Sequence, residues 1–140
     1  MTDLTADLLA QLDAEQELAE LAAPGPWRVN AEMDEVLAED GITVAEGFAL
    51  SGRQLRNTVL HIADHHPERT LRQIEAVRHV VQLHGIVHRD IIWLEDGAET
   101  TAELLVCGLC VPKNSAYRRR KDVPEGPCAT VRHLAQAWQP

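Results

Sequence analysis

The sequence predicts a small α+β domain that is mainly α-helical and contains one short antiparallel hairpin. Apolar side chains recur at steps of three and four along several segments, which is the spacing of one helical face. The dipeptide Asp40-Gly41, typical of hairpin turns, separates two short extended runs. At 140 residues the chain has the length of one domain, so we expect residues 1–140 to form a single domain.

The amino-terminal part is predicted to be an acidic helix followed by the hairpin. Thr2 or Asp3 can cap a helix that covers residues 1–23, and a Pro-Gly-Pro run ends this helix. Residues 27–46 are predicted to form the hairpin, although Glu32–Glu39 is also compatible with a helical turn.

Residues 51–94 are predicted to form two helices joined by a sharp corner. Ser51 is a helix cap for the first, and Pro67 begins the second because proline is tolerated in a first helical turn. The second helix either runs to Trp93 or stops near Gly85, since an interior glycine costs only about 1 kcal/mol relative to alanine. Its apolar face is predicted to carry Ile74, Val77, Val81, His84, His88 and Ile91.

The histidines of this face precede all three cysteines of the chain, and together they indicate a metal site. Cys107 and Cys110 form a CxxC loop that can present two thiolates to one ion. Cys128 precedes a predicted helix, whose N-terminus favours a third thiolate. Zinc takes about four nitrogen and sulfur ligands in a tetrahedron, so a histidine would complete a closed, structural Zn²⁺ site. Spacing alone does not separate His84 from His88.

Other interpretations of these residues are less favoured. His133 would point about 140° away from Cys128 on a shared helix, which makes it a poor ligand. The cysteines could instead be small buried side chains or a redox pair, but no βαβ pattern surrounds the CxxC sequence. We therefore predict a CxxC zinc knuckle, a basic loop and a carboxy-terminal helix within residues 103–138.

The charge distribution is uneven along the chain. The net charge is −9, and residues 1–50 hold twelve acids against one base, whereas residues 51–140 hold ten acids against twelve bases. An acidic first half disfavours binding to nucleic acid, but a local basic segment can contact phosphates and bases. The possible nucleic-acid contacts are Lys113, Tyr117, Arg118, Arg119, Arg120 and Lys121.

The corner between the two helices is the only candidate for a catalytic metal site. His61 and His65 are one helical turn apart, and Asp64 could complete a two-histidine, one-carboxylate set. Asp64 is poorly placed for this on one regular helix, and no glutamate stands where a hydrolytic base is expected. These side chains, and His66 beside them, are therefore expected to face solvent or to cap helices, and no catalytic residue is predicted.

Several segments together resemble a known family. The stretch His61–His84, the acidic first helix ending in Gly25–Val29, the CxxC sequence and the segment Pro127–Ala135 are similar, in this order, to short actinobacterial and actinophage proteins catalogued as domain of unknown function 6221. The family often has Leu-His at the place of Leu83 and His84. This resemblance implies that the metal ligands are His84, Cys107, Cys110 and Cys128, with His88 as the alternative fourth ligand.

The resemblance also has limits. His66 stands where the family usually has an aspartate, and the tail after Ala135 is short. Some members lack the three cysteines, which argues for a structural metal rather than a reaction centre, and the family brings no known activity.

We therefore expect a non-enzymatic, zinc-stabilised helical module that binds another protein, in a regulatory role. The first alternative is a nucleic-acid-binding regulator that uses residues 113–121, and the distant alternative is a metal-dependent hydrolase at His61, Asp64 and His65. The sequence shows no apolar signal segment and no apolar run near the length of a membrane span, so a cytoplasmic location without membrane contact is expected.

Overall fold

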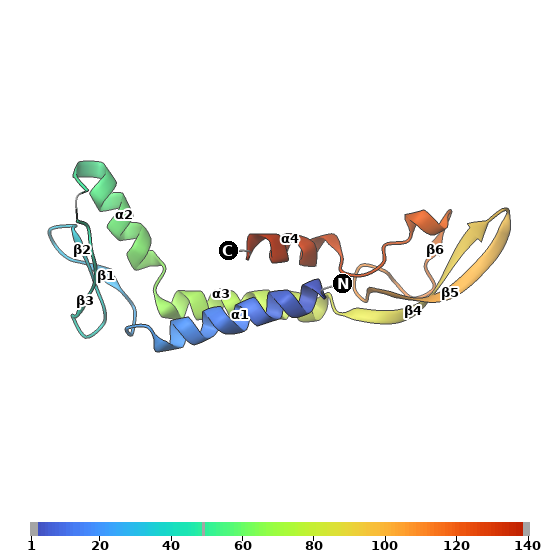
Figure 1. The fold of residues 1–140 in the computed structure, drawn as a ribbon, viewed down its shortest axis with the longest axis horizontal. Helices are drawn as coiled ribbons and strands as arrows, with labels where there is room; N and C mark the ends of the chain where they lie inside the picture. Colours follow the sequence, from blue (N-terminus) through green and yellow to red (C-terminus); the bar gives the residue numbers. More distant parts are fainter. Residues whose placement is uncertain (1–2, 49, 139–140) are drawn as a thin grey trace. The chain divides into compact units, whose positions relative to one another are not determined.

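The computed structural model describes residues 3–48 and 50–138. They form two compact units, one from Met1–Gln11 with Ala76–Pro140 and one from Leu12–Glu75. Helices α1 (Leu4–Leu21) and α3 (Pro67–Leu83) each contribute residues to both units (Figure 1). Among the described residues, each unit contains one three-stranded sheet.

The unit formed by Leu12–Glu75 packs a small antiparallel sheet against a helix. Strands β1 (Arg28–Val29), β2 (Glu35–Leu37) and β3 (Thr43–Glu46) lie in the order β1-β2-β3, and the predicted hairpin is formed by β2 and β3. Helix α2 (Gly52–Asp64) covers this sheet, and the shared core contains Val36, Val59 and Ala63.

The helix starts agree with the sequence signals, although the capping details differ. Asp3 Oδ1 accepts a hydrogen bond of 3.0 Å from the Thr5 N–H and so caps α1, whereas Thr2 lies outside the described residues. Helix α2 begins directly after Ser51, but the Ser51 side chain makes no capping hydrogen bond. Helix α3 begins at Pro67, as predicted.

The prediction that the fold is mainly helical is wrong. Helices account for 44% and strands for 24% of the described residues, so the protein is a mixed α/β domain. Helix α3 ends at Leu83, and strand β4 (Ile86–Glu95) follows Gly85 directly. The β-branched residues between Ile86 and Ile92 favour a strand, and the helical spacing of His84, His88 and Ile91 is a coincidence of the sequence.

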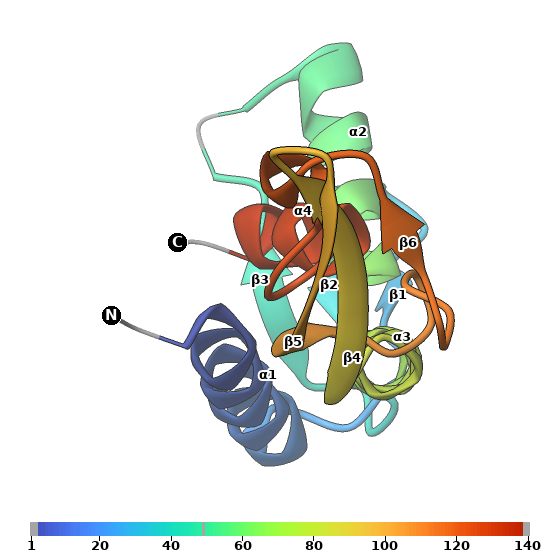
Figure 2. The same cartoon turned by 90° about the vertical axis from the view of Figure 1, so that its right-hand side faces the viewer.

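The unit that contains residues 76–138 is built around a long hairpin. Strand β4 pairs with β5 (Ala98–Cys107) in antiparallel register from Ile86↔Cys107 to Glu95↔Ala98. Asp96 and Gly97 form the turn with φ values of 50° and 83°, which is the backbone of a type I′ hairpin turn. The short strand β6 (Ala116–Tyr117) pairs in parallel with β4 on the side away from β5 (Figure 2).

One face of this hairpin carries the core of the unit. The buried residues Ile91 and Trp93 alternate along β4 with the exposed Asp90 and Leu94 and the half-buried Ile92, as expected for a strand with one buried face. The chain after β5 returns over this face through a short 3₁₀ helix, η1 (Arg120–Asp122), and continues to helix α4 (Ala129–Ala137). The buried core consists of Ile91, Trp93, Val106, Val111 and Val123.

The prediction of a CxxC zinc knuckle is wrong as well. Cys107 is the last residue of the ten-residue strand β5, so the two cysteines continue from a long sheet strand rather than a short approach. The side chains that surround them come from other elements, and the local loop does not form a self-contained motif.

Candidate metal centre

Three separate segments bring four potential metal ligands together. His84 follows the last residue of α3, and its N–H still donates to the Val80 carbonyl at 3.1 Å. Cys107 ends β5, Cys110 follows one tight turn later, and Cys128 is the residue that precedes α4. All four belong to the unit that contains residues 76–138.

The ligand atoms of these four residues lie close together. The Nδ1 atom of His84 is 3.5 Å from the Sγ of Cys107, 3.4 Å from that of Cys110 and 3.3 Å from that of Cys128. All four atoms lie within 4.8 Å of one another. One ring nitrogen takes part in one hydrogen bond, so hydrogen bonding does not explain three sulfur atoms at nearly equal distances.

These distances match the edges of a tetrahedron around an ion. With zinc–sulfur bonds of about 2.3 Å and a zinc–nitrogen bond of about 2.0–2.1 Å, tetrahedral angles give an N···S distance of about 3.6 Å. The observed values of 3.3–3.5 Å are close to this edge length. The four side chains are therefore a possible metal site, and the donor set of one imidazole and three thiols fits zinc.

The thiols differ in their exposure and acidity. Cys107 is buried with 1% of its surface exposed, Cys128 is half-buried and Cys110 is exposed. Contact with the Cys107 thiol, then partial desolvation and the Cys128 thiol, raise the pKa of Cys110 to about 11. Burial raises the pKa of the Cys128 thiol, but the N–H groups of Val131 and Thr130 and the neighbouring thiols outweigh burial and lower it to about 6.

The low pKa of Cys128 arises from the start of α4 and from the neighbouring thiols. The N–H groups of Val131 and Thr130 lie in the first turn of α4, which follows Cys128 directly, and they stabilise the thiolate together with the Cys107 and Cys110 thiols. Three thiolates at this spacing repel one another. A cation at their centre is what would allow all three to ionise together.

Arg89 holds the loop that carries Cys107 and Cys110. Its guanidinium donates to the Gly108 carbonyl at 2.7 Å and, through the other terminal nitrogen, to the Val111 carbonyl. The Gly108 N–H in turn donates to the Gly85 carbonyl at 2.8 Å, which ties the loop to the segment that carries His84. Sequence patterns do not indicate this role, because Arg89 gains it only when β4 and the loop meet in the folded protein.

The two other candidate histidines do not join the cluster. His88 lies on β4 with 65% of its side chain exposed, and its Nδ1 is 3.7 Å from the Glu103 carboxylate. His84 follows the end of α3 at Leu83, whereas His88 lies within β4, so the two residues do not share one helical face and the prediction that His88 lies beside His84 is wrong. His133 is exposed on α4.

The side chains at the corner between α2 and α3 contact other protein groups instead of gathering around one point as metal ligands would. The Nδ1 atom of His65 lies 2.7 Å from the His61 carbonyl oxygen, and the Asp64 carboxylate forms an ion pair with Arg69. His66 contacts Glu68, with 2.8 Å between Nδ1 and Oε2. Within residues 3–48 and 50–138, the cluster at His84 is the one group of three or more histidine, cysteine, aspartate or glutamate side chains that lies close enough to hold a metal ion.

Three residues of the basic segment make contacts within their own unit. Arg119 pairs with Asp122, and Arg120 pairs with Glu125. The Arg120 guanidinium also stacks over the Trp93 ring, at 5.2 Å from its centroid. The remaining members of the predicted contact set have different surroundings: Tyr117 packs against the hairpin core, whereas Lys113, Arg118 and Lys121 are exposed.

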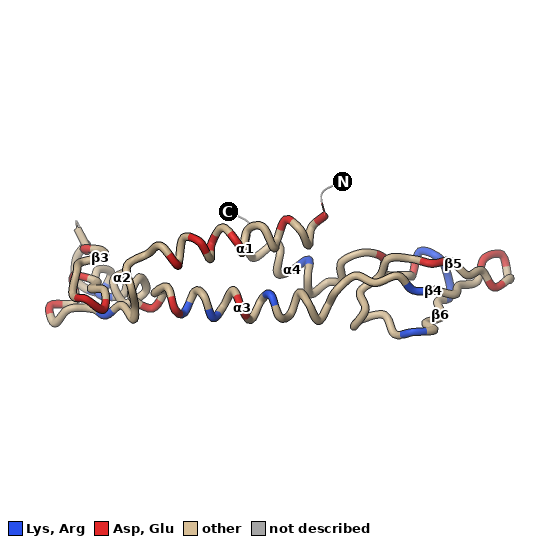
Figure 3. The backbone as a smooth tube through the Cα atoms, turned by 90° about the horizontal axis from the view of Figure 1, so that it is seen from below, with Lys and Arg blue, Asp and Glu red and all other residues tan. Residues whose placement is uncertain are grey.

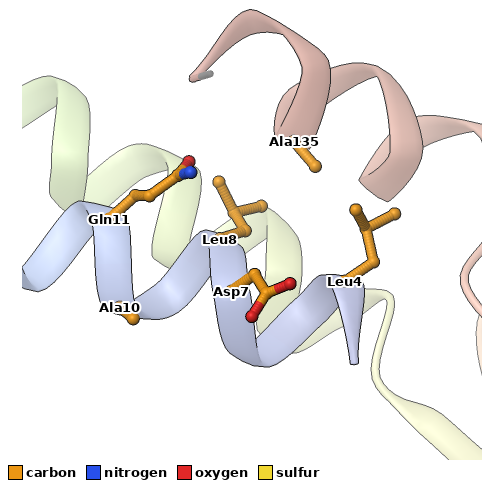
Figure 4. Close-up of a pocket in the computed structure, with 6 residues that line it drawn as sticks. All are labelled: Leu4, Asp7, Leu8, Ala10, Gln11 and Ala135. Carbon is orange, nitrogen blue, oxygen red and sulfur yellow. The ribbon is translucent and has the colours of Figure 1, made fainter. Parts of the chain in front are cut away.

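A shallow pocket lies beside α1 and α4 in the same unit (Figure 4). It has a volume of about 310 Å³, and Asp7 is the ionisable member among the described residues that line it. A lone carboxylate offers neither an acid–base pair nor an activated nucleophile. The lining residues are Leu4, Asp7, Leu8, Ala10, Gln11 and Ala135.

No helix in the described part of the chain has both the length and the apolar character needed to cross a membrane. Comparison with curated proteins and with solved structures gives no match. A family model does match, and it covers residues 1–140, the whole sequence. The chain therefore belongs to the family of unknown function DUF6221.

Proposed function

We propose that the protein is a non-enzymatic module in which a structural Zn²⁺ ion, held by His84, Cys107, Cys110 and Cys128, stabilises a surface that binds another protein. The observation that carries the proposal is the position of His84 Nδ1, at 3.3–3.5 Å from three cysteine sulfur atoms. Three thiolates and one imidazole complete a tetrahedral zinc shell. A complete shell has no position for substrate or a reactive water, which supports a structural role.

The proposed ion would join three segments of the chain. His84 follows α3, Cys107 and Cys110 end the hairpin, and Cys128 starts α4. Structural zinc in small domains provides about 10–16 kcal/mol of apparent binding free energy, and this energy becomes folding free energy where the site forms only in the folded chain. Such a contribution would hold α4 on its unit.

Charge and exposed apolar side chains support a protein partner. Helix α1 carries acidic side chains and no lysine or arginine (Figure 3). Two of its leucines are largely exposed, Leu18 at 71% and Leu21 at 78%, and Phe48 is 87% exposed. The two leucines share α1 with its acidic side chains, and this negative charge is unfavourable for nucleic acid, which supports a protein partner instead.

The nucleic-acid alternative has weaker support. Ion pairs engage Arg119 and Arg120, and Tyr117 is partly buried against the core of the hairpin, which reduces the ring surface that could stack on a base. Binding to DNA or RNA that falls steeply with salt and disappears in the Arg118→Ala, Arg119→Ala, Arg120→Ala triple variant would favour this alternative over the proposal.

The metal part of the proposal is tested by elemental analysis of protein purified without added metal. We expect one zinc per chain, and we expect Cys107→Ser to lose the zinc and to melt at a clearly lower temperature. The partner is tested by affinity purification from the native host, with residues 113–121 either intact or neutralised. A protein retained by both forms supports the proposal, whereas nucleic acid retained only by the intact form contradicts it.

A further inference from the structure

We infer that Cys110 is an oxidation site, at which hydrogen peroxide forms a Cys107–Cys110 disulfide and expels the zinc ion. This inference rests on the proposed zinc site and goes beyond its structural role. Cys110 is the proposed ligand most sensitive to oxidation, because the three cysteines of the site differ strongly in their access to solvent.

The first step depends on exposure. Cys110 is exposed, whereas Cys107 has 1% of its surface exposed and Cys128 is half-buried. Oxidants react with accessible thiolates, and a zinc-bound cysteine is held as a thiolate. Cys110 is therefore the cysteine of this site that a small oxidant in solution meets first.

The second step depends on a neighbouring thiol. Cys107 lies three residues before Cys110, and the Val111 N–H donates to the Cys107 carbonyl at 3.0 Å, which closes the chain between them into a tight turn. Their sulfur atoms belong to a set whose members all lie within 4.8 Å. A sulfenic acid beside a second thiol condenses to a disulfide, and the short loop between these two cysteines keeps the entropic cost of ring closure low.

The chemistry balances with one molecule of hydrogen peroxide. The Cys110 thiolate attacks one peroxide oxygen, the O–O bond breaks and hydroxide leaves, which gives a sulfenic acid at Cys110. The Cys107 thiolate then attacks the Cys110 sulfur, the S–O bond breaks and a second hydroxide leaves. Two thiolates have lost two electrons in total, and the peroxide has been reduced to two hydroxide ions.

Metal release follows from the number of ligands that remain. A disulfide between Cys107 and Cys110 leaves only His84 and Cys128 to hold the ion. Zinc sites in proteins use three or four protein ligands, so two ligands retain the ion poorly. His84 and Cys128 lie on different segments, and loss of the ion removes the link between the end of α3 and the start of α4.

The test uses the full chain. Reduced protein is first assayed for zinc and then exposed to a small excess of hydrogen peroxide, with a chromogenic chelator to record the released ion. We expect zinc release to parallel the loss of two thiols per chain, and peptide mass mapping to find the Cys107–Cys110 disulfide. Zinc that stays bound to peroxide-treated protein overturns the inference and leaves the proposed site intact, whereas reduced protein without zinc overturns both.

Two matched variants identify the reacting pair. Cys110→His removes the exposed thiol, and Cys128→His keeps the CxxC pair; each is loaded with zinc, and release is expressed as a fraction of its starting metal content. We expect Cys110→His to release zinc at least about tenfold more slowly than Cys128→His. Equal rates in the two variants contradict the inference. A disulfide that contains Cys128 in the peroxide-treated wild-type protein also contradicts it, and this second measurement does not require either variant to bind zinc.

Discussion

Replacing Arg89 with alanine should weaken binding of the proposed zinc ion, although Arg89 is not one of the four proposed ligands. The Arg89 guanidinium donates to the carbonyl groups of Gly108 and Val111, which frame the Cys110 loop. A hydrogen bond from a charged donor contributes about 1.5 kcal/mol or more, so the two bonds together contribute about 3 kcal/mol. Water can replace part of this at a partly buried site. We therefore expect a net loss of about 1.4–2.8 kcal/mol, or about 10- to 100-fold in the Kd for zinc.

Competition with a chromogenic chelator measures this Kd directly. The matched control is Arg118→Ala, which removes the same charge from an exposed position. Arg89→Lys should fall between wild type and Arg89→Ala, because an ammonium group lacks the planar fork that reaches two carbonyl groups at once. A Kd for Arg89→Ala within about twofold of that for Arg118→Ala would refute the role assigned to Arg89.

Three further predictions concern the fold. Ile91→Ala empties a fully buried position in the hairpin core and should cost about 2–5 kcal/mol in the free energy of unfolding, measured by urea denaturation; a loss below about 1 kcal/mol would show that this core is wrongly assigned. Gly97→Ala forces an alanine into the turn at a φ of 83° and should destabilise the protein by about 1 kcal/mol in the same assay, through backbone strain alone because a Cβ there meets no atom within 4 Å; an unchanged stability would contradict the assigned turn. The His66 side chain, the backbone N–H of Glu68 and the Gly25 N–H hold the pKa of the Glu68 carboxyl below its ordinary value. At pH values above the ordinary pKa, the ionised carboxylate therefore stabilises the fold, and this contribution disappears as the pH falls through the lower pKa of the folded state. Denaturation midpoints should therefore be higher for wild type than for Glu68→Gln at pH 7 and should converge in acid; a difference that persists at about pH 3 contradicts the assignment.

The four clustered side chains could be named from the sequence because the chain offers few alternatives. It contains three cysteines, two of them in CxxC spacing, so three members of a four-residue site are given and only the fourth has to be chosen among a few histidines. The choice between His84 and His88 depended on where α3 ends. Gly85 marked one possible end, but the Leu83-His84 pair of the family resemblance was needed to favour His84.

Helical spacing alone predicts a helix rather than a strand after Gly85, because His84, His88 and Ile91 happen to follow that spacing. A period-two pattern was present in the same residues, since Ile91 and Trp93 are buried and alternate with other side chains. The Asp96-Gly97 dipeptide was a hairpin signal of the same kind as Asp40-Gly41. The contact of Arg89 with the loop that carries Cys107 and Cys110 joins residues about twenty positions apart, and no local pattern encodes it.

The most direct test of the central claim is X-ray absorption spectroscopy at the zinc edge, combined with the metal content of the purified protein. The account predicts one zinc per chain with three sulfur neighbours at about 2.3 Å and one nitrogen neighbour at about 2.0–2.1 Å. Purified, reduced protein that contains no zinc, or a spectrum dominated by oxygen neighbours that Cys107→Ser leaves unchanged, would contradict it.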